Sequence, residues 1–160
     1  MDSDLTSKLF IQLGGDMFKN VLIPVSIEGL KKTDIKKLFN SIGADVRKVT
    51  LTFVSDPFPP YMYAEYGDVY TIADADHRKA CRSFADKLFT KVGSKLNGVI
   101  YDTCHIYNAN VVDGIIDASK KSKADVIAMV SHKRRGLAGV FLGSDTQRVI
   151  LSTKLPVLVV

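Results

Sequence analysis

Short, uninterrupted apolar runs recur along the chain and predict buried strands. Residues 21–25 read Val-Leu-Ile-Pro-Val and residues 126–130 read Val-Ile-Ala-Met-Val, with no polar residue at alternate positions. Runs of this length without alternation are typical of strands covered on both faces of a parallel sheet. We expect three further strands, at residues 49–54, 99–106 and 156–160.

Between these runs, apolar residues recur at every third or fourth position, which predicts amphipathic helices. We expect helices at residues 28–42, 74–92, 111–122 and 144–151. In the second helix the spacing predicts a buried stripe of Ala80, Phe84, Leu88 and Val92. Strands joined by helices require right-handed crossovers. The predicted fold class is therefore a doubly wound α/β sandwich with about five parallel strands and helices on both faces.

Two segments depart from this alternation. Residues 1–16 place leucines at helical spacing but end in two glycines, so we expect a flexible or non-native extension ahead of one domain at residues 17–160. Residues 56–73 hold three prolines and four of the six tyrosines, which is too irregular for a regular element. A loop that packs its own aromatic side chains and a lid or partner-binding surface both fit this composition.

The composition also predicts the cellular compartment of the protein. No apolar run approaches the roughly eighteen residues that cross a bilayer. The acidic start, with Asp2 and Asp4, lacks the basic region of a secretory signal. Two cysteines, Cys81 and Cys104, are too few for a disulfide framework. These features predict a cytoplasmic protein without a membrane contact.

The charge is unevenly distributed along the chain. The formal net charge is +5, and residues 118–160 alone hold eight basic and two acidic residues, so the excess lies in that segment. Such a surplus attracts nucleic acid or phosphate-bearing ligands. No recognised nucleic-acid module accompanies it, so nucleic-acid binding through the basic C-terminal quarter is the weakest alternative.

The predicted topology also predicts where a ligand binds. In an open parallel sheet, ligands bind beyond the carboxyl ends of the strands where the strand order reverses. We expect that point between the first and fourth strands, which end at residues 24–26 and 129–132. The loop that follows contains Lys133, Arg134 and Arg135 and runs into a helix.

The start of that helix is a candidate anion site. The Gly143-Ser144 turn begins it, and the free N–H groups and the dipole of a helix start favour phosphate. The stretch from Ser144 to Gln147 also fits a capping box, with Ser144 as the cap, which explains the serine without a ligand.

Taken together, these segments resemble the universal stress protein family. The resemblance covers residues 18–160 and rests on five pieces, namely the opening Phe-Lys-Asn-Val-Leu-Ile-Pro-Val, the strand end at 53–56, the segment 124–132, the turn 142–144 and the closing strand 156–160. It implies a non-catalytic stress-response protein that forms a homodimer, here through the closing strand. In the ATP-binding branch of the family, ATP is bound, with Mg²⁺.

The resemblance also implies a set of nucleotide contacts in this chain. They are Pro24, Ser26 and Val54 at the adenine and ribose end, Met129, Val130, His132 and Lys133 in the loop, and Gly143, Ser144, Asp145 and Thr146 at the phosphate end.

Three positions depart from the pattern of the ATP-binding branch, which carries G-x-x-G followed after nine residues by G-[ST]. Gly143 and Ser144 match, whereas Val130 and Lys133 replace the two upstream glycines, and Ser26 replaces an aspartate. The Lys133 side chain either fills space that phosphate needs or serves as a cation for it. Two functions stay open, a nucleotide-binding protein and a dimeric protein-interaction module of the branch that binds no nucleotide. In the second, residues 56–73 are the candidate surface for the protein partner.

The sequence shows no pattern of catalytic machinery. No Ser/His/Asp order, carboxylate pair or nucleophile elbow stands out, so we expect no enzyme. His77 and Cys81 lie four residues apart and could share a metal ion, but a structural zinc site needs four ligands, so we expect no metal. Cys104 and His105 are expected to be packed side chains of the third strand.

Overall fold

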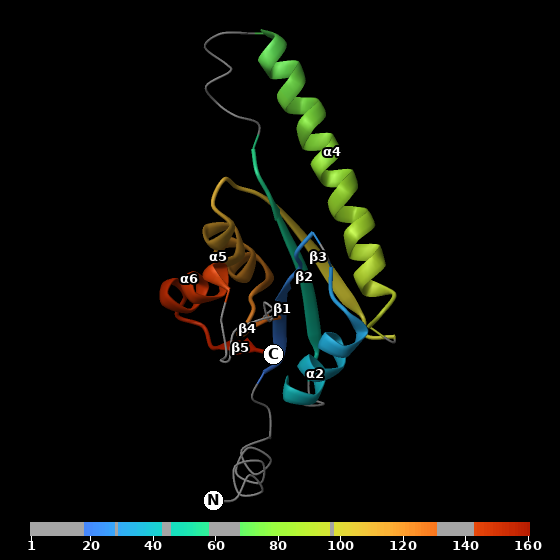
Figure 1. The fold of residues 1–160 in the computed structure, drawn as a ribbon, viewed down its shortest axis with the longest axis vertical. Helices are drawn as coiled ribbons and strands as arrows, with labels where there is room; N and C mark the ends of the chain where they lie inside the picture. The colour runs from blue at the N-terminus through green and yellow to red at the C-terminus, as the bar shows by residue number, and fades with distance from the viewer. Residues whose placement is uncertain (1–17, 28, 43–45, 58–67, 97, 131–142) are drawn as a thin grey trace, which may run out of the picture.

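The computed structural model describes residues 18–27, 29–42, 46–57, 68–96, 98–130 and 143–160 (Figure 1). Five strands form one sheet, namely β1 (Asn20–Pro24), β2 (Lys48–Ser55), β3 (Tyr101–Tyr107), β4 (Val126–Met129) and β5 (Val157–Val159). The helices of the described residues are α2 (Lys32–Ile42), α4 (Asp68–Gly93), α5 (Val111–Ser122) and α6 (Ser144–Ser152).

All strands of the sheet are parallel, in the order β3-β2-β1-β4-β5. The chain moves outward from β1 through β2 to β3 and then returns to the other side of β1 for β4 and β5. Val21 therefore has neighbours from both halves, Val49 of β2 and Val126 of β4. The predicted doubly wound sandwich is confirmed, and so is the reversal of strand order between the first and fourth strands.

Helices cover both faces of the sheet, and each face has its own core (Figure 1). Val21 and Ile23 of β1 pack on the side of α2 and α4, whereas Leu22 packs on the side of α5 and α6. This double burial explains why the strand sequences are continuously apolar. Among the described residues, no helix is long and apolar enough to cross a membrane.

Helix α4 differs from its prediction at its start and along its buried face. It begins at Asp68, so the last part of the segment predicted to be irregular is helical. Ala80 and Phe84 are exposed, whereas Leu88 and Val92 are buried as predicted, and Ala85 and Phe89 complete the buried face. Residues four apart drift by about 40° around a helix of 3.6 residues per turn, so a stripe in steps of four cannot stay against a sheet.

Helix α2 begins at Lys32, four residues later than predicted. Gly29 adopts a φ of 74°, a left-handed conformation that favours glycine, and its N–H donates to the Ser26 carbonyl in a turn. The helix therefore starts only after this turn. The predicted extension at residues 1–16 and most of the tyrosine-rich segment lie outside the described residues.

Candidate functional site

The carboxyl ends of β1 and β4 lie side by side at the reversal of strand order. The two strands pair through Val21 with Val126 and through Leu22 with Ile127. Of the predicted contacts at this edge, Ser26 is exposed, Pro24 and Val130 are half-buried, and Met129 is buried in the α5 and α6 core. The structure thus brings Pro24, Ser26 and Val130 to one accessible edge and keeps Met129 beneath it.

Helices α5 and α6 both begin at this edge, because each follows a parallel strand and runs back across the sheet. Gly143 is the N-cap of α6 and makes no side-chain cap hydrogen bond, while Ser144 is the first residue of the helix. The predicted capping box with Ser144 as the cap is therefore wrong. A serine followed three residues later by glutamine fits the motif, but the Gly143 carbonyl accepts the bond from the Gln147 N–H, which sets the cap one residue earlier.

In the part of the chain that the structure describes, no side chain caps the first turn of α6. Within the described residues, no side chain accepts a hydrogen bond from the N–H groups of Ser144, Asp145 or Thr146. Gly143 has a φ of −58°, and among the described residues a Cβ added there would meet only Thr146 Oγ1, at 3.9 Å. Neither backbone conformation nor packing therefore requires glycine at this position. What glycine does provide is a position without a side chain directly at the helix start.

The side chains of this turn divide between solvent and core. Ser144 and Asp145 are exposed, whereas Thr146 is buried. The Thr146 side chain therefore belongs to the packing of α6 rather than to the accessible part of the predicted phosphate end.

Arg148 is a cation at this edge that the sequence analysis did not single out. Its Nη2 donates to Asn110 Oδ1 at 3.4 Å, and its Nη1 lies 3.9 Å from Asp145 Oδ1. Asn110 caps α5, since its Oδ1 also accepts from the Val112 N–H at 3.0 Å. Arg148 thus lies between the starts of two helices. Helical side chains tilt toward the N-terminus of their helix. Because Arg148 lies one turn after Ser144, this tilt could have identified it as a cation near the helix start.

Val54 has a supporting position beneath α5. It is half-buried in the α5 and α6 core, and a Cβ added to Gly114 of α5 would lie 2.6 Å from Val54 Cγ1. Gly114 therefore allows α5 to approach β2 closely. The remaining two predicted contacts, His132 and Lys133, lie outside the described residues.

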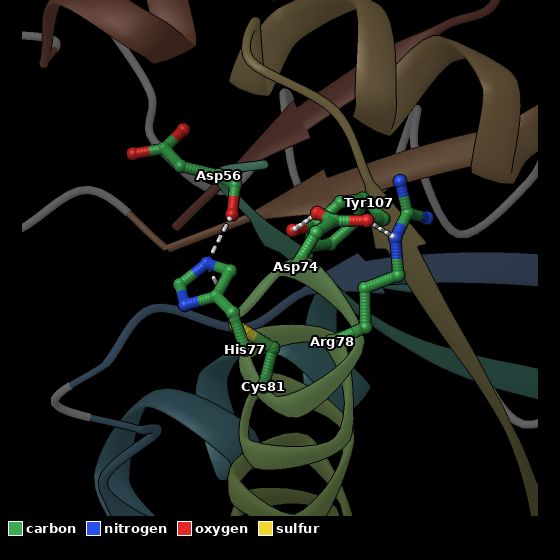
Figure 2. A network of polar contacts seen from close by, with 6 residues as sticks. All are labelled: Asp56, Asp74, His77, Arg78, Cys81 and Tyr107. Carbon is green, nitrogen blue, oxygen red and sulfur yellow. Dashed lines mark hydrogen bonds and ion pairs between the residues drawn. The ribbon is translucent and has the colours of Figure 1, made fainter. Parts of the chain in front are cut away.

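A second polar cluster joins α4 to the ends of β2 and β3 (Figure 2). Arg78 Nε donates to Asp74 Oδ2 at 2.7 Å, and Tyr107 Oη donates to Asp74 Oδ1 at 3.2 Å. The Arg78 guanidinium also lies 4.1 Å from the centre of the Tyr107 ring. The hydrogen bond from Arg78 is the main cause that lowers the pKa of Asp74, against a smaller opposing effect of burial. The cluster fastens α4 to an edge strand.

His77 and Cys81 belong to the same cluster. His77 Nε2 lies 3.0 Å from the Asp56 carbonyl oxygen and 3.5 Å from Cys81 Sγ. A carbonyl only accepts, so Nε2 carries the proton and cannot deprotonate the thiol. Among the described residues, no third His, Cys, Asp or Glu joins them as a metal ligand.

Cys104 and His105 occupy packed positions on β3. His105 Nε2 is hydrogen-bonded to Ser55 Oγ at 2.7 Å, and the ring stacks on Phe53. Burial lowers the pKa of His105 and raises the pKa of the Cys104 thiol. Burial thus favours the uncharged form of both side chains.

The fold and this edge define a doubly wound α/β protein with a candidate ligand site at the reversal of strand order. The sequence profile of the universal stress protein family matches residues 17–160, and the chain belongs to this family. No curated protein sequence matches the chain significantly.

Three solved structures illustrate the likeness. The hypothetical protein MJ0577 is 19% identical with a TM-score of 0.59, over 90% of this chain and 96% of its own. A universal stress family protein from Burkholderia pseudomallei is 19% identical with a TM-score of 0.56, over 91% of this chain and 98% of its own. A universal stress protein in complex with cAMP is 14% identical with a TM-score of 0.55, over 91% of this chain and 98% of its own. At these identities the likeness shows the fold.

Proposed function

We propose that the chain binds an adenine nucleotide at the edge between β1 and β4 and acts in a stress response without catalysis. The observation that carries the proposal is the uncapped first turn of α6, entered through Gly143, next to the reversal of strand order. Doubly wound sheets bind ligands at such points, and helix starts bind phosphate. The related fold crystallised with cAMP supports the same class of ligand.

The described side chains have distinct roles in this proposal. Pro24 and Val130 offer apolar contact to the base, and the exposed Ser26 hydroxyl can donate to or accept from the ribose. The N–H groups of Ser144 and Asp145 face the phosphates, with Arg148 as a nearby positive charge. The exposed oxygen atoms of Ser144 and Asp145 are of the kind that Mg²⁺ takes, which fits a nucleotide bound with Mg²⁺.

Thermal unfolding with Mg²⁺-ATP tests the proposal. A ligand at about one hundred times its dissociation constant stabilises the folded state by about 2.7 kcal/mol, which shifts the Tm of a domain of this size by several degrees. We expect such a rise with millimolar ATP, and a smaller one with equal concentrations of GTP and Mg²⁺. An unchanged Tm at millimolar ATP contradicts nucleotide binding.

The variant Lys133→Gly, measured in the same assay, defines the role of the lysine. Weaker ATP binding in the variant identifies Lys133 as a cation for phosphate, and stronger binding identifies it as an obstruction. We expect weaker binding, because Lys133 introduces a positive charge where the ATP-binding branch has an uncharged glycine, whereas Val130, the other replacement, introduces none.

The dimeric interaction module is the second candidate function. Strand β5 is an edge of the sheet, and its three residues are half-buried. The preceding helix α6 exposes Leu151 by 85% and Ile150 by 39%. We propose that a second copy covers this apolar edge.

The oligomeric state tests this second proposal. Light scattering coupled to size exclusion should give the mass of a dimer for the natural chain and of a monomer for Leu151→Glu. The exposed control Lys154→Glu should leave the dimer intact. A natural chain that is monomeric at high micromolar concentration contradicts the proposal.

A further inference from the structure

An open groove runs along the outward face of α4, on the face of the sheet opposite to α5 and α6. Its volume is about 700 Å³, and it is lined by Lys79, Arg82, Ser83, Asp86, Lys87, Thr90 and Lys91. These positions recur at three and four residues, so they share one side of the helix. In Figure 1 no labelled element lies outside α4 on this side.

The lining of the groove is strongly basic and largely unpaired. Asp86 is its one acidic residue, and its Oδ1 lies 3.5 Å from Arg82 Nε. Within the part of the chain that the structure describes, Lys79, Lys87 and Lys91 have no ion-pair partner. Three ammonium groups therefore face solvent along one helix.

Helix α2 extends this positive charge. It packs on the same face of the sheet as α4 and exposes Lys32, Lys36 and Lys37. Lys95 Nζ, beyond the end of α4, donates to the Leu30 carbonyl at 2.6 Å, which joins the end of α4 to the start of α2. The two basic helices thus adjoin, although residues 1–117 as a whole carry slightly more acidic than basic residues.

We propose that the α4 groove docks an acidic helical segment of another protein. From Lys79 to Lys91 the helix rises about 18 Å, the length of about three turns of a partner helix. Cations at helical spacing match carboxylates at helical spacing along such a partner. The aliphatic stems of the lysines, together with Phe84, which is 44% exposed, add apolar contact.

Asp86 favours a peptide over a nucleic acid as the occupant. Its carboxylate lies in the middle of the lining, where a phosphodiester chain with a charge at every step meets repulsion. A peptide can place a neutral or basic side chain opposite this one position.

Fluorescence anisotropy with a designed peptide tests this proposal. The probe is a fluorescein-labelled helical peptide of about sixteen residues, with glutamates on one face and leucines beside them, and its control replaces every glutamate by glutamine. We expect the acidic peptide to bind the natural chain and the glutamine peptide to bind at least about tenfold more weakly.

Two triple variants with the same net charge locate the binding. Lys79→Glu, Lys87→Glu and Lys91→Glu reverse the groove, whereas Lys120→Glu, Lys121→Glu and Lys154→Glu reverse exposed positions elsewhere. We expect about tenfold weaker binding for the groove variant and an almost unchanged affinity for the other. Circular dichroism checks that both variants fold. If a Lys→Glu variant is unfolded, the corresponding Lys→Gln variant is measured in its place.

Three outcomes overturn the proposal. One is no binding of the acidic peptide to the natural chain. Another is an equal loss of affinity for the acidic peptide in the two triple variants, which indicates unspecific attraction by the net charge of the protein. The third is tighter binding of a single-stranded oligonucleotide of equal length, lost in the groove variant, which identifies nucleic acid as the occupant. Nucleotide binding at the β1 and β4 edge is independent of all three.

Discussion

Gly143 shows how a single residue can serve a site without being needed by the fold. Its φ of −58° is available to any residue, and among the described residues an added Cβ meets no atom closer than 3.9 Å. We therefore expect Gly143→Ala to change the free energy of unfolding by less than about 1 kcal/mol.

The same substitution should weaken ATP binding about tenfold, because the methyl group stands at the entrance to the α6 N–H groups. Calorimetric titration beside denaturant unfolding measures both quantities. The control Ser152→Ala, at the other end of α6, should change neither. Undiminished affinity in Gly143→Ala would show that phosphate does not approach this turn.

The packing around His105 determines the direction in which the pKa of its ring is shifted. Burial, and to a smaller extent the positive charge of Arg82, favour the neutral ring, so its pKa lies below the ordinary value of 6.5. The unfolded chain then binds a proton at a higher pH than the folded chain. The contribution to stability is complete above the ordinary pKa and is lost as the pH falls through 6.5 toward the lowered value.

Nuclear magnetic resonance titration of the ring protons should therefore report a pKa below 6.5 for His105. The pH dependence of unfolding in this window should also be weaker in His105→Phe, which keeps the ring contact with Phe53. A measured pKa at or above 6.5 contradicts this account of the packing. Arg82 and Asp86 act on the same ring in opposite directions, so Asp86→Asn should lower the pKa further.

At the scale of elements, the contact between α5 and β2 depends on a glycine. An added Cβ at Gly114 lies 2.6 Å from Val54 Cγ1, so Gly114→Ala must push the helix or the valine aside. Overpacking of this kind costs about 1–3 kcal/mol, offset by up to about 1 kcal/mol because alanine favours a helix. We expect a net loss of stability in denaturant unfolding.

A double-mutant cycle identifies the cause. Val54→Ala alone leaves a cavity, and combining it with Gly114→Ala fills part of that space, so the double variant should be more stable than the sum of the single effects predicts. Additive effects would show that the two residues do not compete for the same volume.

Some elements could be predicted because burial on both faces leaves a plain signature in sequence. The runs around Val21 and Val126 are continuously apolar, and helix α5 was predicted with the bounds that the structure shows, Val111–Ser122. The start of α4 could not be predicted, because its first turns follow a segment rich in proline and tyrosine. The first half of its predicted stripe, Ala80 and Phe84, was wrong because steps of four residues drift off a helical face, whereas Leu88 and Val92 are buried as predicted.

The candidate site was predictable only in part, for a related reason. Topology places Pro24 and Val130 at one edge, and the strand order follows from the sequence pattern. The sequence did not decide the start of α6, since glycine and serine are both common N-cap residues and either Gly143 or Ser144 could take that position. Arg148 was missed because its contact partner Asn110 lies 38 residues earlier in the chain, at the start of another helix.

At the scale of the whole molecule, charge segregates by surface rather than along the chain. Sums over the sequence place the positive excess in residues 118–160. In the folded protein, α2 and the second half of α4 also form a basic face, because their lysines point outward from one side of the sheet. This face and the candidate nucleotide edge are separate surfaces, so each can be altered without the other.

The central claim is that an adenine nucleotide binds where α6 begins. Amide chemical shifts of the isotopically labelled protein, titrated with Mg²⁺-ATP, test it most directly because they locate the ligand as well as detect it. The largest changes are expected at the amides of Ser144 and Asp145, with further changes at Ser26 and Val130. Unchanged amide shifts at the start of α6 at saturating ATP would contradict it.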